Sequence, residues 1–133
     1  MVCLVLGDSI AVGTQQALAE QGVVCERRAR VGISSNSIED YPVVTNANTV
    51  IISAGSNDNP RLNNVPTYER LRAKYVGKKV VWILPRNRII ARQVLQVIVK
   101  YRDAYVDGYS FEPADRLHPK YYGSVARAVR KKM

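Results

Sequence analysis

The hydrophobic positions of the chain form short apolar runs separated by longer stretches with helical spacing. Five of the apolar runs are rich in β-branched residues and predict strands, at 2–6, 23–26, 49–53, 79–84 and 104–106. Apolar residues three and four positions apart predict helices over 10–21, 67–75, 88–101 and 119–131, with one short helix near 35–40. Strands and helices therefore alternate along the whole chain.

This alternation predicts the fold class. Parallel strands need crossover connections, which are usually helical, so we expect an α/β fold: a three-layer α/β/α sandwich around a central, mostly parallel five-stranded sheet. The length of 133 residues, 47% of them hydrophobic, is typical of a single domain, here 1–133. Functional groups in such a sheet gather beyond the carboxyl ends of the strands, so the loops that follow each strand are the places to search.

Polar residues in those loops have the chemistry of a serine nucleophile. Ser9 follows the first strand, and His118, the only histidine, is the one side chain suited to take its proton near neutral pH. Asp115 stands three residues before His118, where a tight turn lets its carboxylate fix the imidazole tautomer and stabilise the imidazolium. The backbone N–H groups of Ser9 and Gly32 and the side-chain amide of Asn57 can donate to the oxyanion of an attacked carbonyl.

These residues stand in four blocks that together resemble the blocks of the GDSL or SGNH hydrolases. The blocks are "GDSI", Gly32 in "RVGISS", "GSND" and "DRLHP", in the family's order, with Ile10 in place of the usual leucine. The resemblance implies the flavodoxin-like SGNH hydrolase fold. It also implies that Ser9 is the nucleophile, that Asp115 and His118 complete the triad, and that the oxyanion hole consists of Ser9, Gly32 and Asn57.

The expected activity is ester hydrolysis through a covalent acyl-enzyme, without a metal or an organic cofactor. One histidine and two distant cysteines are too few ligands for a zinc hydrolase. Short acyl esters on carbohydrate, acetyl esters of cell-envelope polymers included, are the leading substrates, because a small chain offers little apolar surface for a long acyl tail. A lysophospholipase or thioesterase is the alternative within this chemistry, and a non-catalytic binding module for an anionic polymer is the alternative outside it.

Candidate substrate contacts lie in the loops after the third and fourth strands. They are Asn59, Arg86 and Asn87. Asp58, beside Asn57, has no chemical role in this interpretation, and its replacement by asparagine is expected to cost little.

Charge and cysteine content bear on partners and compartment. Twenty Lys and Arg against 11 Asp and Glu give a net charge of +9, which fits either a solvated surface or an anionic partner. Charge alone supports no specific nucleic-acid binding, and no apolar run is long enough for membrane insertion or a signal peptide. We expect a soluble protein, cytoplasmic or released to act on the envelope. Cys3 and Cys25, each in an apolar run, are expected to be buried and reduced, with a disulfide between them as the alternative that the sequence does not support.

Overall fold

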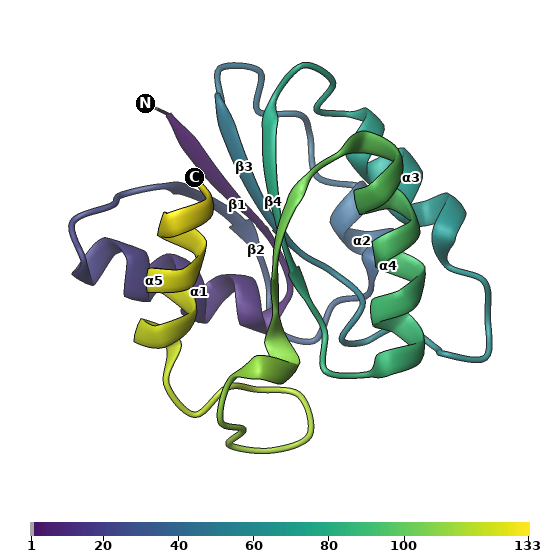
Figure 1. Cartoon of the computed structure of the whole chain (residues 1–133). Helices are drawn as coiled ribbons and strands as arrows, with labels where there is room; N and C mark the ends of the chain where they lie inside the picture. The colour runs from purple at the N-terminus through teal and green to yellow at the C-terminus, as the bar shows by residue number, and fades with distance from the viewer. Residues whose placement is uncertain (1) are drawn as a thin grey trace.

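The computed structural model describes residues 2–133, and its centre is a five-stranded parallel sheet (Figure 1). The strands are β1 (Cys3–Gly7), β2 (Glu26–Ala29), β3 (Thr49–Ser53), β4 (Lys79–Leu84) and β5 (Ala104–Asp107). They lie in the order β2-β1-β3-β4-β5, and each neighbouring pair is parallel. The predicted α/β class with a central parallel sheet is confirmed.

Helices cover both faces of this sheet and make three layers (Figure 1). One face carries α1 (Ser9–Glu20) and α5 (Tyr122–Lys132), and the other carries α2 (Ser35–Glu39), α3 (Val65–Ala73) and α4 (Arg88–Tyr101). Successive residues of a strand point to opposite faces, so Leu4 and Val5 belong to two separate apolar cores. A short 3-10 helix, Gly108–Ser110, follows β5. No helix of residues 2–133 has both the length and the apolar character needed to cross a membrane.

Two elements begin later in the chain than the sequence predicted. The strand is Glu26–Ala29 and shares only Glu26 with the predicted run 23–26. Val24, in the middle of that run, is 79% exposed. An edge strand needs no continuous apolar run, which is why its polar residues gave no signal. The last helix begins at Tyr122 instead of 119, because the N–H of Lys120 donates to the carbonyl of Glu112 (2.8 Å) and keeps this segment extended.

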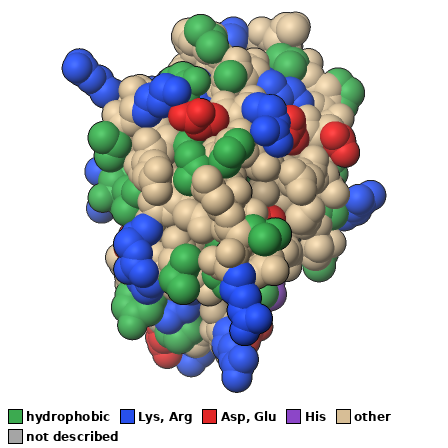
Figure 2. All heavy atoms as spheres, turned by 90° about the vertical axis from the view of Figure 1, so that its right-hand side faces the viewer, with side chains coloured by type: hydrophobic (Ala, Val, Ile, Leu, Met, Phe, Trp, Pro, Cys, Tyr) green, Lys and Arg blue, Asp and Glu red, His purple; other side chains and the backbone are tan. Residues whose placement is uncertain are grey.

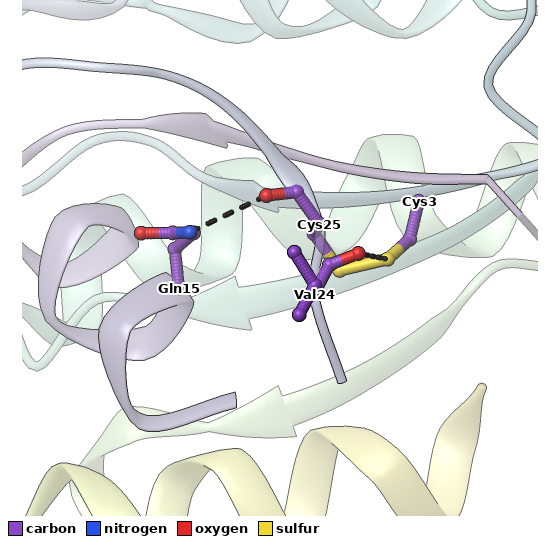
Figure 3. Close-up of a disulfide and its surroundings, with 4 residues drawn as sticks. All are labelled: Cys3, Gln15, Val24 and Cys25. Carbon is purple, nitrogen blue, oxygen red and sulfur yellow. Dashed lines mark hydrogen bonds between the residues drawn. A yellow bond between two sulfur atoms is a disulfide. The ribbon is translucent and has the colours of Figure 1, made fainter. Parts of the chain in front are cut away.

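The prediction that the two cysteines are reduced is wrong. Cys3 and Cys25 form a disulfide that ties the start of β1 to the residue before β2, with the Cα atoms 4.7 Å apart (Figure 3). In the β1–β2 register Leu4 pairs with Glu26, so the two cysteines are the preceding pair. Gln15 of α1 donates to the carbonyl of Cys25 (3.3 Å) and fixes the same corner.

Candidate active site

Ser9 and His118, which are 109 positions apart in the sequence, meet at the carboxyl end of the sheet. Ser9 is the first residue of α1, directly after the turn that ends β1, and its Oγ lies 2.8 Å from Nε2 of His118. Nδ1 of His118 lies 3.0 Å from each carboxylate oxygen of Asp115. The predicted serine, histidine and aspartate thus form a continuous hydrogen-bonded chain, in which the imidazole can take the serine proton while the carboxylate fixes its tautomer.

A tight turn presents Asp115 to the imidazole. Its Oδ1 accepts from the backbone N–H groups of Leu117 and His118, both at 2.8 Å. These two backbone hydrogen bonds, helped by the His118 side chain, lower the pKa of Asp115 to about 2, so the carboxylate is charged at neutral pH. The N–H of Ala114 donates to the carbonyl of His118 (2.9 Å) and closes the loop.

Glycine is required where β1 turns into α1. Gly7 has φ +150°, and a Cβ there would lie 2.0 Å from the carbonyl oxygen of Ser53 on β3. The carbonyl of Gly7 accepts from the N–H of Arg30 beyond β2 (3.1 Å), and the N–H of Asp8 donates to the carbonyl of Ser53 (3.2 Å). The turn that leads to Ser9 is therefore hydrogen-bonded on both sides, to the residue after β2 and to β3.

Asp8 is a buried carboxyl group directly before Ser9 in the chain. Its side chain is the N-cap of α1, with Oδ1 accepting from the N–H of Ile10 (3.1 Å) and from the hydroxyl of Ser53 (2.9 Å). Burial raises its pKa to about 6, against the opposing effect of these hydrogen bonds. An aspartate just before a helical pattern predicts a cap. Nothing local in the sequence predicts that the capping group is fully buried.

The predicted oxyanion donors lie in loops on either side of β1. Gly32 follows β2 and Asn57 follows β3, the two strands that pair with β1. Gly32 has φ +81°, a conformation that favours glycine. The Asn57 amide donates one N–H to the carbonyl of Ile33 (3.0 Å), which links the two loops and leaves the second N–H of this exposed side chain for a ligand. The sequence prediction thus identified three groups that the sheet order brings to one edge.

Asp58 has a position that the sequence analysis missed. Its carboxylate accepts from the backbone N–H and the hydroxyl of Ser35 at the start of α2 (2.9 and 2.6 Å) and from the hydroxyl of Tyr68 on α3 (2.6 Å). Burial and the neighbouring carboxylate raise the pKa of Tyr68. Asp58 therefore joins the Asn57 loop to the segment that follows Gly32, a structural position that the sequence did not indicate. Its partners lie 23 and 10 positions away, so no local pattern marks them.

The three candidate substrate contacts differ in their surroundings. Asn59 uses its Oδ1 in a local turn with the N–H of Arg61 (2.9 Å). Asn87 caps α4 through Oδ1 and keeps its amide N–H groups free of that cap. Arg86 and Asn87 both line a groove that also contains Asp115, so two of the three residues lie beside the candidate triad. Within residues 2–133, no three His, Cys, Asp or Glu side chains are grouped so as to hold a metal ion.

The arrangement of the sheet and its helices is shared with solved structures of low sequence identity. A candidate SGNH hydrolase from Slackia heliotrinireducens has a similar structure, with a TM-score of 0.73 and 16% identity over 100% of this chain and 98% of that chain. The C-terminal catalytic domain of Streptococcus pneumoniae peptidoglycan O-acetyltransferase A, solved with a methylsulfonyl adduct, has a TM-score of 0.68 and 14% identity over 98% of this chain and 91% of that domain. The resemblance stated from the four sequence blocks is thus confirmed at the level of the fold. No family model and no curated protein matches the sequence.

Proposed function

We propose that this chain is a serine esterase that removes short acyl groups, acetyl above all, from carbohydrate of the cell envelope through an acyl-enzyme. The observation that carries the proposal is the hydrogen-bonded chain from Ser9 Oγ through the His118 imidazole to the Asp115 carboxylate, with distances of 2.8 and 3.0 Å. A serine that only capped a helix would need no imidazole at this distance. The same contact argues against a non-catalytic binding module.

The reaction uses these groups in two half-steps. His118 takes the Ser9 proton at Nε2 as Oγ attacks the ester carbonyl carbon, and the N–H groups of Ser9 and Gly32 with the Asn57 amide stabilise the oxyanion. Collapse of this intermediate breaks the bond to the alcohol, which leaves with the proton held by His118. Water, deprotonated by the same imidazole, then attacks the acyl-enzyme, and the carboxylic acid leaves as Ser9 regains its proton.

Two observations support an envelope carbohydrate over a lipid acyl chain. The disulfide between Cys3 and Cys25 fits an oxidising compartment outside the cytoplasm. One of the similar structures is the catalytic domain of a peptidoglycan O-acetyltransferase, an enzyme that handles acetyl groups on an envelope polymer.

Acyl transfer is the second candidate, and that structural similarity favours it. A transferase forms the same acyl-enzyme on Ser9 but passes the acyl group to a hydroxyl other than water. Turnover of 4-nitrophenyl acetate with and without added chitooligosaccharide separates the two. Acetylated oligosaccharide as the main product indicates transfer, and free acetate in both mixtures indicates hydrolysis.

The test of the nucleophile is covalent labelling with a fluorophosphonate followed by peptide mass mapping. We expect one label, on Ser9, lost in His118→Ala. The matched control is Ser110→Ala, which removes an exposed hydroxyl from the 3-10 helix after β5 and should leave labelling unchanged. Folded protein that takes no label, or takes it at another serine, refutes the proposal.

A further inference from the structure

An open groove of about 620 Å³ lies next to the candidate triad. Its walls are the loop after β4, with Arg86 and Asn87, and the segment Pro113–Leu117 that ends beside His118. Asp115 belongs both to this groove and to the hydrogen-bonded chain with Ser9. A ligand held in the groove is therefore a neighbour of the reacting ester.

Arg86 is held in place on the groove wall without an acidic partner. Its Nη1 donates to the carbonyl of Phe111 (3.1 Å), and its guanidinium lies over the ring of Tyr109, 4.9 Å from the centroid. Arg88 stacks on the same ring at 4.7 Å, but both its Nη groups bind the carboxylate of Asp107 (2.8 and 2.9 Å), which cancels its charge. Among residues 2–133, Arg86 makes no salt bridge, although its charge also helps to lower the pKa of Asp107, and its remaining N–H groups are left for a ligand.

Arg116 adds an unpaired charge from the opposite wall. Its side chain is exposed and has no hydrogen-bond or ion-pair partner in the part of the chain that the structure describes. The Asn87 amide contributes further donors. The one carboxylate on the walls is that of Asp115, whose oxygens already accept from His118 and two backbone N–H groups. The polar groups of the groove are thus mostly donors, and its side chains carry a net positive charge.

The overall charge of +9 does not by itself explain this cluster, because basic side chains are spread widely over the molecule. Figure 2 shows Lys and Arg side chains scattered over the face covered by α3 and α4, with some projecting at its lower end, the end to which the strands point in Figure 1. The groove differs from the rest of the surface because three donor groups surround one cavity: the fixed guanidinium of Arg86, the free guanidinium of Arg116 and the amide of Asn87. The same cavity contains Asp115 of the candidate triad.

We propose that this groove binds an oxyanion, a carboxylate or a phosphate carried by the sugar unit that bears the ester. A planar guanidinium whose position is already fixed loses little conformational entropy when it binds such a group. It can also donate two parallel hydrogen bonds to it. The inference rests on the proposed esterase function and adds to it that the substrate is an acidic glycan.

The kinetic test compares three acetyl esters: 3-O-acetylglucose, 3-O-acetylglucuronate and 3-O-acetylglucose 6-phosphate. We expect the wild-type kcat/KM to be about tenfold or more higher for an acidic ester than for the neutral one, since one charge-assisted interaction is worth about 1.4 kcal/mol or more. The two acidic esters distinguish a carboxylate from a phosphate. Equal kcat/KM for all three refutes the proposal.

Three charge-matched variants locate the effect. Arg86→Gln and Arg116→Gln should each lower the acidic-to-neutral ratio about tenfold towards one. Arg102→Gln, which removes an exposed arginine at the C-terminus of α4, should leave the ratio unchanged. Arg116 makes no contact that folding needs, so its variant remains informative if Arg86→Gln disturbs the Phe111 contact. A ratio that falls equally in all three variants indicates general attraction by net charge and overturns the proposal.

Binding to Ser9→Ala separates failure of the groove from failure of the esterase. We expect titration with glucuronate or glucose 6-phosphate to shift the backbone amide resonances of Asn87, Tyr109 and Ala114, and glucose to leave them unchanged. Shifts without any ester turnover by the wild type uphold the groove and refute the esterase. Turnover of neutral esters without shifts upholds the esterase and refutes the groove.

Discussion

Replacing Asp58 by asparagine tests whether the oxyanion side of the site is positioned by a carboxylate that touches no substrate. Asp58 accepts three hydrogen bonds, from the N–H and hydroxyl of Ser35 and the hydroxyl of Tyr68. Asparagine can keep the bond from the N–H but loses the charge that strengthens the two hydroxyl bonds. Because hydrogen bonds to a charged group are worth about 1.5–3 kcal/mol each and the amide recovers part of this, we expect the free energy of unfolding to fall by about 2–4 kcal/mol.

The same change should lower kcat. Ser35 begins the helix that follows the Gly32 loop, and Asn57 is bonded to Ile33 of that loop, so loosening Asp58 moves both oxyanion donors. A misplacement of about 1 Å at a catalytic group can cost about a hundredfold, and we expect a loss of ten- to a hundredfold in kcat with KM for 4-nitrophenyl acetate nearly unchanged. Urea denaturation and steady-state kinetics well below the melting temperature measure the two effects separately.

Partner variants distinguish positioning from plain destabilisation. Ser35→Ala breaks the hydroxyl link to the Gly32 side and should lower kcat. Tyr68→Phe removes only the bond from α3, so it should lower stability and largely spare kcat. Asp40→Asn, which changes an exposed carboxylate at the end of α2, should alter neither by more than about 0.5 kcal/mol. Wild-type kcat in folded Asp58→Asn, or equal kcat losses in the Ser35 and Tyr68 variants, would show that Asp58 only stabilises the fold.

Three further outcomes are expected. Because the disulfide closes a loop with a sequence separation of 22, replacing Cys3 and Cys25 together by alanine should lower the free energy of unfolding by about 3 kcal/mol, as measured in urea, and reduction of the wild type should do the same. The pKa of Asp8 is raised to about 6, so the folded state keeps a proton that the unfolded state loses near pH 4. The free energy of unfolding should therefore fall by about 3 kcal/mol between pH 4 and 7, and Asp8→Asn should remove this fall. Ser9→Ala and His118→Ala should each abolish turnover of 4-nitrophenyl acetate with no further loss in the double variant, since each group is inactive without the other; losses that multiply contradict a shared step.

The central strands could be predicted because both of their faces are buried. Thr49–Ser53 and Lys79–Leu84 are strands at the predicted positions, because a central parallel strand needs a continuous apolar run. The edge strand Glu26–Ala29 has one neighbour and exposed side chains, so its sequence carries no such run. The disulfide could not be predicted either, because its two cysteines face each other only in the register that this edge strand adopts.

The same distinction applies to the candidate site. Ser9, Asn57 and Asp115 could be predicted because each follows a predicted strand or precedes the last helix, and because the reaction requires these chemical groups. The supporting residues could not, because their roles depend on which helix packs beside which loop. Tyr68 reaches Asp58 only because α3 packs against α2 over the sheet, and Ser53 reaches Asp8 only because β3 pairs with β1.

The two sides of the site are consequently built in different ways. On the oxyanion side, Asp8 and Asp58 bind hydroxyl groups of buried residues and tie the loops to the core. On the acid–base side, Asp115 is 58% exposed and His118 is 34% exposed, and their loop is held by its own backbone hydrogen bonds. Replacing Asp58 or Ser35 on the first side should therefore lower stability and kcat together, whereas His118→Ala should abolish turnover at almost unchanged stability. The exposed loop is also a wall of the groove, because Asp115 belongs to both.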